Sequence, residues 1–286
     1  MADIDINHLR SWIGRQESRC DLITAAPLAC LGAALDRPAC GSVTGAGAGE
    51  PLPPLWHWLY FLPAPPASQL DIDGHALRGD FLPPVPLPRR MWAGSNIRFE
   101  SAPRVGDPLR RVSTIADVSH KQGSSGELVF VTVRHEVFSA ATLALTEEQQ
   151  LVYRDQSGGI STRPALAAPA AAQWSRELVP DPVLLFRYSA LTFNSHRIHY
   201  DRDYAVAIEG YAGLVVQGPL TATLLLDTLH RHLPGKRLAS FRFRGVKPLL
   251  DGQPIQFQGR RDGDTVSLWA LDSTGALAMQ ANAELA

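Results

Sequence analysis

The sequence has 286 residues, of which 45% are hydrophobic and 19% charged, so it is long and apolar enough for one large or two ordinary folded domains and does not read as a disordered chain. Its formal net charge of -1 argues against attachment to nucleic acid or anionic lipid through bulk charge, and we expect a smaller, more specific partner. Cys20, Cys30 and Cys40 form no Cys-x-x-Cys pair, so buried or unreactive thiols are predicted rather than a zinc site or disulfides.

The N-terminal segment is acidic and lacks the apolar core of an export signal, and no later apolar run is long enough to span a membrane. These features predict a cytoplasmic protein without a membrane partner. Apolar residues at helical spacing between residues 5 and 18 predict an amphipathic first helix. A second helix is expected from Thr24 to Leu35, where almost every residue is apolar, and we predict that it is buried on most sides.

Loops rich in glycine and proline are expected at 37–54 and 63–90, and the aromatic run between them, from Trp56 to Leu62, predicts a strand. From Ile97 the apolar pattern changes to a period of two, which is typical of strands with one buried face. The predicted strands cover residues 97–100, 109–118, 128–138 and 143–153. We expect them to form a strongly curved antiparallel meander.

A segment rich in glycine, alanine and proline at 155–180 predicts a linker with some helix at its end, and after it the same order of elements recurs. A short helix near 203–208 and a long apolar helix from Pro219 to His232, with Gly218 as its N-cap, precede four further strands. These strands are expected at 238–246, 254–261, 266–271 and 276–285.

Each half therefore contains one buried helix followed by a meander of strands, which indicates a duplicated unit. A buried helix needs apolar cover around its whole circumference, and a curved sheet wrapped around it supplies that cover. We predict an α+β double hot-dog fold with a first unit at 1–154, a linker at 155–180 and a second unit at 181–286.

Polar side chains are densest between Leu191 and Asp201, in the run Leu-Thr-Phe-Asn-Ser-His-Arg-Ile-His-Tyr-Asp. His199 could act as a base there, Asn194 could orient a water molecule, and the Gly218 amide could donate a hydrogen bond to a developing enolate oxygen. Together these groups could add water across a double bond conjugated to a carbonyl. On spacing alone, a purely structural role for His199 is the alternative.

The same residues carry a resemblance to a known family. The run from Tyr188 to His199, Tyr-Ser-Ala-Leu-Thr-Phe-Asn-Ser-His-Arg-Ile-His, is followed from Gly213 by Gly-Leu-Val-Val-Gln-Gly-Pro-Leu. Both runs resemble the MaoC-like (hydratase 2) enoyl-thioester hydratases and dehydratases. The closest branch contains mitochondrial-type 3-hydroxyacyl-thioester dehydratases and mesaconyl-C4-CoA or itaconyl-CoA hydratases. The resemblance is strong over 181–286 and weaker in the first half, where Pro88 to Phe99 resembles the family's non-catalytic unit.

In this resemblance the catalytic histidine of the family falls on His199 and the oxyanion glycine on Gly218, whereas Asn194 replaces the catalytic aspartate. An amide cannot exchange protons as a carboxylate does. The resemblance therefore implies that His199 alone moves the proton through a water held by Asn194, with His196 and Asp201 as alternative acid/base residues. It further implies reversible hydration of an α,β-unsaturated acyl-CoA without a metal or redox cofactor, coenzyme A being part of the substrate.

The branch resembled, together with several arginines, favours a short, branched, carboxylate-bearing substrate such as itaconyl-CoA or mesaconyl-C4-CoA. The expected substrate-binding residues are Arg90, Tyr188, His196, Arg197, Gln217 and Arg244. A solvated position is an equal alternative for Arg90 and Arg244. No metal site is predicted at His57, His120 or His135, because no carboxylates or cysteines cluster beside them in the sequence.

Three other functions remain open from the sequence. The first is a 3-hydroxyacyl-thioester dehydratase of fatty acid synthesis. The second is an acyl-CoA thioesterase, which would call for a carboxylate near the helix start that Gln217 to Leu220 do not supply. The third is a non-enzymatic acyl-CoA-binding module. The carrier (coenzyme A or acyl carrier protein), the favoured reaction direction and pairing into a homodimer are also open.

Overall fold

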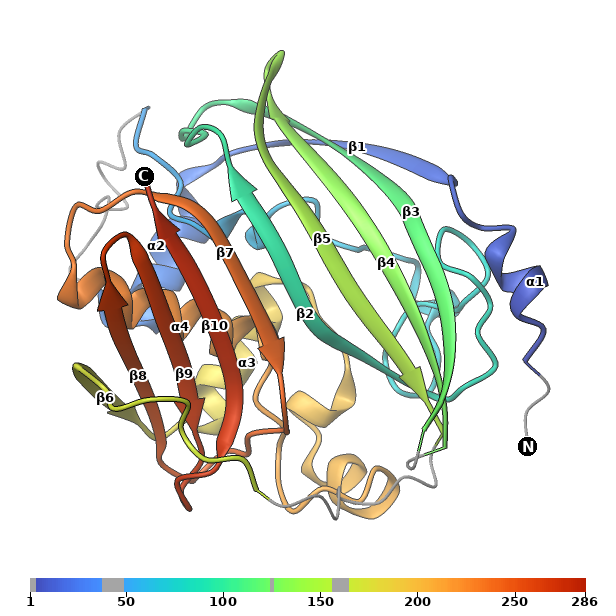
Figure 1. Cartoon of the computed structure of the whole chain (residues 1–286). Coiled ribbons are helices and arrows are strands. Elements are labelled where there is room, and N and C mark those ends of the chain that lie inside the picture. The colour runs from blue at the N-terminus through green and yellow to red at the C-terminus, as the bar shows by residue number, and fades with distance from the viewer. Residues whose placement is uncertain (1–3, 38–48, 124–125, 156–164) are drawn as a thin grey trace.

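One antiparallel sheet of ten strands organises the computed structural model, which describes residues 4–37, 49–123, 126–155 and 165–286 (Figure 1). The strands of the first half are β1 (Gln16–Leu22), β2 (Arg89–Phe99), β3 (Pro108–Gly123), β4 (Gly126–Ser139) and β5 (Thr142–Arg154). Those of the second half are β6 (Trp174–Leu178), β7 (Leu238–Gly245), β8 (Ile255–Asp262), β9 (Thr265–Leu271) and β10 (Leu277–Leu285).

The two halves of the sheet have the same strand order. From its outer edge inward, the first half runs β1-β3-β4-β5-β2 and the second runs β6-β8-β9-β10-β7. They join where β2 pairs with β7, with Ile97 opposite Phe241 and Gly94 opposite Arg244. This repeated topology confirms the duplicated unit and the double hot-dog fold predicted from the sequence.

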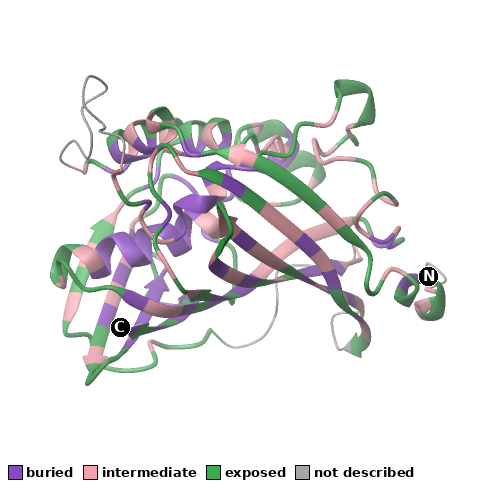
Figure 2. Ribbon diagram, turned by 90° about the horizontal axis from the view of Figure 1, so that it is seen from above, coloured by how far each residue is buried: buried purple, intermediate pink, exposed green. Residues whose placement is uncertain are grey.

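Strands form where the sequence alternates because one face of the sheet is buried and the other meets solvent. In β10, for example, Ala281, Ala283 and Leu285 are buried, while Asn282 and Glu284 between them are exposed. Figure 2 shows this alternation of buried and exposed positions along the strands. The buried positions form one apolar face of the sheet, and this face packs against the helices.

Helix α4 (Gly218–His232) is the central helix of the second half. Every residue from Leu220 to Leu229 is buried, as the long apolar run predicts. Inside this helix Asp227 is 1% exposed, and its carboxylate accepts hydrogen bonds from Arg37, Arg176 and Arg231. The helix is therefore packed by apolar contacts along its length and held near its C-terminal end by ion pairs.

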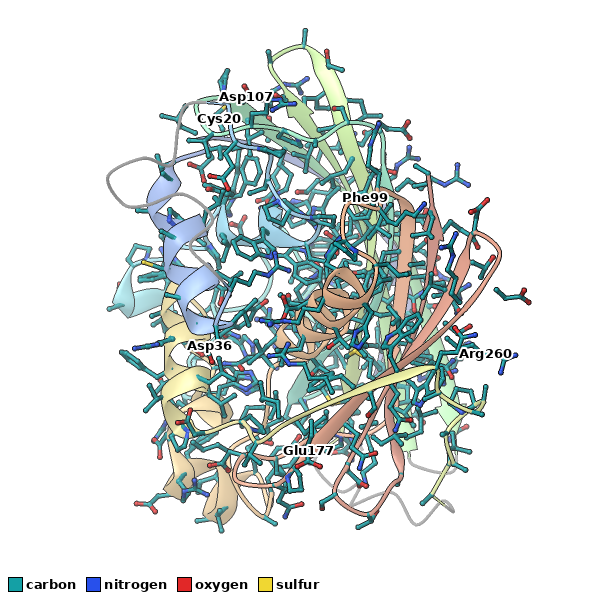
Figure 3. The ribbon with its side chains drawn as sticks, turned by 90° about the vertical axis from the view of Figure 1, so that its left-hand side faces the viewer. Cys20, Asp36, Phe99, Asp107, Glu177 and Arg260 are labelled. Atoms are coloured by element: carbon teal, nitrogen blue, oxygen red, sulfur yellow. The ribbon has the colours of Figure 1, made fainter. Side chains whose placement is uncertain are left out.

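The first half has no corresponding central helix among its described residues, and the prediction of one at 24–35 is wrong in its burial. Helix α2 (Ala25–Ala34) buries Leu28, Leu31 and Gly32 and leaves much of its surface exposed. Figure 3 shows α2 and α3 (Pro182–Leu191) along one side of the molecule, with α4 between them and the strands of the second half. Small alanine side chains make a helix apolar without giving it a large face to bury.

The aromatic run at 56–62 is also not the predicted strand. It contains the 3-10 turn η1 (Trp56–Leu59), followed by an irregular segment, and Trp56, Tyr60 and Phe61 are buried in the core. Large aromatic residues are enriched in strands, but here their side chains pack into the same hydrophobic core cluster as the residues of α4.

Other sequence predictions are corrected in part. The first helix, α1 (Ile6–Arg10), is short and β1 follows it, while the end of the predicted linker contains strand β6 and no helix in 165–180. Helix α3 was not predicted. Cys20 and Cys30 are exposed, contrary to the buried alternative. Cys40, most of the predicted loop at 37–54 and residues 156–164 of the linker lie outside the described residues.

The remaining short elements are the 3-10 turns η2 (Ala67–Gln69) and η3 (Arg197–His199) and the π-helical turn η4 (Tyr204–Ile208). The last of these matches the short helix predicted near 203–208. None of the described helices combines the length and apolar character needed to cross a membrane.

Candidate active site

A cleft of about 2350 Å³ opens where the start of α4 meets α3 and the sheet. Residues from both halves of the chain line it. Most of the residues predicted from the sequence are among them, namely Arg90, Tyr188, Asn194, His196, His199, Gln217, Gly218 and Arg244. Arg197 is not part of this lining.

The motif reaches the cleft because the chain turns sharply at the end of α3. Phe193 adopts a left-handed conformation with φ 49°, and the backbone N–H of Asn194 donates to the Ser189 carbonyl at 2.8 Å. The side-chain oxygen of Asn194 then accepts the backbone N–H of His196 at 3.1 Å. This local bond is typical of asparagine in turns and fixes the loop that leads to His199.

His199 is 7% exposed, and its Nδ1 lies 2.6 Å from the carbonyl oxygen of Val215. Since a carbonyl oxygen can only accept, Nδ1 must carry the proton in this bond, and Nε2 of the neutral ring keeps its lone pair. Burial lowers the pKa of His199 from 6.5 to about 4. His199 is therefore a neutral, oriented imidazole at physiological pH.

Helix α4 begins at Gly218, and Gln217 rather than Gly218 is its N-cap. The side chain of Gln217 is 1% exposed and donates to the Leu185 carbonyl at 3.0 Å and to the Ser189 hydroxyl at 2.9 Å. These bonds tie the start of α4 to α3. The Gly218 N–H belongs to the first turn, where helix geometry provides no intrahelical acceptor, so it is available to a ligand oxygen.

Three other predicted residues, Arg197, Tyr188 and Arg244, lie in surroundings that differ from one another. Arg197 is bound to Asp201 at 2.7 Å and lies over the ring of Tyr204, so this pair is engaged outside the cleft lining. Burial raises the pKa of the Tyr188 hydroxyl well above its usual range, which keeps this side chain neutral. Arg244 is exposed on β7.

Sequence reasoning missed two site residues, Asp73 and His75, which come from a loop of the first half. The Arg197 N–H donates to the Asp73 carbonyl at 2.9 Å, and the Ser195 hydroxyl donates to the Gly74 carbonyl at 2.6 Å. These bonds hold the loop directly against the motif. The two segments are more than a hundred residues apart in the chain, so neither spacing nor local pattern could have joined them.

A chain of rings leads from this loop to His199. Nδ1 of His75 is 2.8 Å from an Asp73 carboxylate oxygen, the His75 and His196 ring centres are 4.1 Å apart, and those of His196 and His199 are 5.4 Å apart. The ligand atoms of Asp73, His75 and His196 lie within 4.8 Å of one another, so these three side chains could hold a divalent metal ion.

A second buried polar cluster lies in the first half of the cleft. The Glu147 carboxylate accepts hydrogen bonds from Trp58 and Ser95 and contacts His57 at 3.0 Å. Although burial raises the pKa of Glu147, its contacts with His57 and Ser95 outweigh that effect and lower it to about 2. Both carboxylate oxygens therefore have partners. Because His57 and Trp58 lie in η1 and Glu147 and Ser95 lie in strands, the cluster joins η1 to the sheet.

Residues 55–251 match the family model of hydroxyacyl-thioester dehydratase type 2. The chain is 47% identical to the mesaconyl-C4-CoA hydratase of Chloroflexus aurantiacus, with 96% of this chain and 97% of the relative covered. It is 27% identical to the mitochondrial hydroxyacyl-thioester dehydratase type 2 of Schizosaccharomyces pombe, over 72% of this chain and 76% of the relative.

Solved structures with similar folds have far lower identity. A MaoC-like dehydratase from Phytophthora capsici superposes with a TM-score of 0.70 at 14% identity, with 99% of this chain and 98% of that chain covered. A Mycobacterium tuberculosis protein described as having a double hotdog fold gives a TM-score of 0.61 at 12% identity, with 96% of both chains covered. At these identities the likeness shows the fold.

Proposed function

Because the chain belongs to the hydroxyacyl-thioester dehydratase type 2 family, with its MaoC-like hot-dog fold, we propose that its cleft hydrates a short, branched, dicarboxylic enoyl-CoA such as mesaconyl-C4-CoA or itaconyl-CoA. The chain is a hydro-lyase that acts on an α,β-unsaturated acyl-CoA. The identity of the acyl group rests on the 47% identical relative from Chloroflexus aurantiacus.

The observation that carries the mechanism is the bond between Nδ1 of His199 and the Val215 carbonyl, because it leaves Nε2 as the free base. In the hydration direction, Nε2 takes a proton from water as the water oxygen bonds to the β-carbon of the substrate. The π electrons of the double bond move onto the thioester oxygen, where the Gly218 N–H stabilises the enolate. The α-carbon then takes the proton from Nε2, and the ring returns to its neutral state.

Asn194 is proposed to hold the attacking water. Its side-chain oxygen already accepts the His196 N–H, but a carbonyl oxygen has a second lone pair that can accept a bond from water. This arrangement needs no proton from Asn194. The proposed reaction also needs no metal or redox cofactor, since one histidine removes and returns the same proton.

The other residues proposed to bind substrate differ in their exposure. Tyr188 and Gln217 are buried in the cleft lining and His196 lies beside His199, whereas Arg244 is exposed and is proposed to meet the phosphates of coenzyme A. Arg90 is proposed to bind the free carboxylate of the acyl group. A cytoplasmic location and a homodimer stay predictions.

The direct test replaces His199 with alanine and follows the loss of enoyl-CoA absorbance with mesaconyl-C4-CoA. We expect turnover to fall by roughly 1000-fold, within the range for removal of a general base. The matched control is His8→Ala, since His8 is an exposed histidine outside the cleft. Near wild-type turnover of the His199 variant would remove the proposed base.

A second candidate is dehydration of 3-hydroxyacyl thioesters carried by acyl carrier protein. The 27% identical relative from Schizosaccharomyces pombe favours it, because its name describes a hydroxyacyl-thioester dehydratase. The two candidates share the chemistry and differ in substrate. Turnover of 3-hydroxyacyl thioesters on acyl carrier protein in preference to mesaconyl-C4-CoA would select the second.

A further inference from the structure

Two tryptophans from the first half of the chain, Trp58 of η1 and Trp92 of β2, lie beside the start of α4. Their rings meet edge to face with centres 5.0 Å apart, and both side chains line the cleft. A Cβ at Gly218 would lie 3.8 Å from the Trp92 carbonyl, so the backbone of Trp92 is next to the proposed oxyanion donor. We call the rings of Trp58 and Trp92 the indole pair.

The indole pair is packed against the protein core. The ring of Phe243 in β7 is 3% exposed, and its centre lies 6.0 Å from that of Trp58 and 6.3 Å from that of Trp92. Both indoles are partly buried against the largest hydrophobic cluster of the described residues. Because a close-packed interior leaves large rings few alternative positions, the indole pair forms a rigid part of the cleft surface.

One buried carboxylate holds both indole N–H groups. Nε1 of Trp58 donates directly to Glu147 at 3.0 Å. The Ser95 hydroxyl donates to the same carboxylate at 2.6 Å and accepts Nε1 of Trp92 at 3.0 Å. An indole N–H can only donate, so these bonds fix the orientation of each ring as well as its position. Glu147 is therefore the shared anchor of the indole pair.

The proposed function relates the indole pair to one end of the substrate. It assigns the free carboxylate of the acyl group to Arg90, which lies two residues before Trp92 in β2. Side chains two residues apart in a strand leave the same face of the sheet, so Arg90 and Trp92 face the same end of the ligand. The other end carries the phosphates of coenzyme A, which must stay hydrated. The acyl end is therefore the one that meets the indole pair.

We infer that the indole pair limits the length of the acyl group, and that Glu147, acting with Ser95, is the residue that positions the pair. This inference rests on the proposed function and deepens it, because it names the residues that select a short acyl chain. The cleft lining continues on the neighbouring strands, with Leu151 opposite Trp92 in register and Val133 in β4. These apolar side chains would contact a longer acyl chain once an indole is removed.

The experiment compares crotonyl-CoA with oct-2-enoyl-CoA, which is four methylene groups longer. For Trp58→Ala we expect the kcat/KM for oct-2-enoyl-CoA, relative to that for crotonyl-CoA, to rise by about 10-fold to 100-fold, because the added methylene groups become buried. The control Trp174→Ala removes a partly buried tryptophan outside the cleft lining and should leave the ratio unchanged. Trp92→Leu serves if Trp58→Ala does not fold. A wild-type ratio in the variant that folds would overturn the inference.

The positioning role of Glu147 is tested by the same ratio. Glu147→Leu should raise it by about fivefold, on the scale of one lost hydrogen bond, because the indoles lose their shared acceptor. Glu147→Gln should restore it, since the amide keeps an acceptor for Trp58 and a partner for Ser95. A general loss of stability would lower turnover of both substrates alike. Ser95→Ala, which detaches Trp92 from the carboxylate, serves if Glu147→Leu does not fold. An unchanged ratio would overturn the role of Glu147.

Binding of saturated thioesters separates this inference from the proposed function. If the wild-type protein hydrates no enoyl-CoA, the proposed function fails, yet the dissociation constants of butyryl-CoA and octanoyl-CoA still test the indole pair. Trp58→Ala should tighten octanoyl-CoA relative to butyryl-CoA by about tenfold or more. The same relative affinity in the variant and the wild type would overturn the role of the indole pair, and binding of neither thioester would overturn both proposals.

Discussion

His199 and Val215 are joined by a hydrogen bond of 2.6 Å between Nδ1 and the backbone oxygen, and the Val215 N–H returns a bond of 2.9 Å to the Ile198 carbonyl. Val215 lies three residues before Gly218, where α4 begins. The proposed base and the proposed oxyanion donor are thus attached to the same short backbone segment. Their separation is set by backbone bonds rather than by mobile side chains.

The first prediction concerns the pH dependence of stability. Burial lowers the pKa of His199 from 6.5 to about 4 in the folded protein, so between these values the unfolded chain binds the proton more readily. The stability that His199 provides in its neutral form is present above pH 6.5 and is lost as the pH falls toward 4. We expect this loss to be about 3 kcal/mol.

Urea unfolding of the wild type and of His199→Gln at several pH values measures this effect. The difference between the two free energies of unfolding should change across the window from pH 6.5 to about 4 and stay constant above it. A difference independent of pH would mean that His199 titrates normally in the folded state. The kcat of the wild type should also fall as the pH approaches 4, because a protonated Nε2 cannot act as a base.

The second prediction concerns the Gly218 amide. Proline at this position removes the N–H, and we expect kcat to fall by roughly 100-fold to 1000-fold, as for loss of one oxyanion donor. Gly218→Ala is the matched control, because it keeps the N–H and its Cβ would lie 3.8 Å from the Trp92 carbonyl, an ordinary contact. Equal kcat values for the two variants would exclude a role for this N–H in catalysis.

The third prediction concerns Gly74, which has φ +88° and lies against the motif. A Cβ there would come within 1.9 Å of the Ser195 carbonyl oxygen, so Gly74→Ala must push the loop away. We expect kcat/KM for mesaconyl-C4-CoA to fall at least tenfold. Gly106→Ala controls for backbone strain, since Gly106 also has positive φ and a Cβ there meets no atom within 4 Å. Similar losses in both variants would show that strain, not contact, is responsible.

The fourth prediction concerns stability far from the cleft. Asp227 is buried in α4 and paired with three arginines, so Asp227→Ala leaves these cations without their partner. We expect the free energy of unfolding to fall by about 3–5 kcal/mol. The exposed ion pair of Asp264 with Arg261 gives the comparison, and Asp264→Ala should cost less than about 1 kcal/mol. Denaturant unfolding measures both, and equal losses would contradict the special role of the buried carboxylate.

Much of the fold could be predicted because its signals are local. The period-two strands, the apolar run of α4 and the polar motif ending at His199 all lie within short stretches of sequence. The errors at α2 and at Trp56 to Leu62 have a common cause, since apolar composition does not reveal what a segment packs against. Asp73 and His75 could not be placed in the site because their loop meets the motif only through contacts between residues far apart in the sequence.

The pairing of β2 with β7 joins the two hot-dog units within one chain, and this affects how their sequences can evolve. In an assembly of two identical hot-dog units, every substitution would appear twice, and a loop could not be altered in one copy alone. Here the two copies share one chain, so each can vary independently. One copy keeps His199, the proposed base, while the other is free to change its packing and to adapt a loop to a particular acyl group.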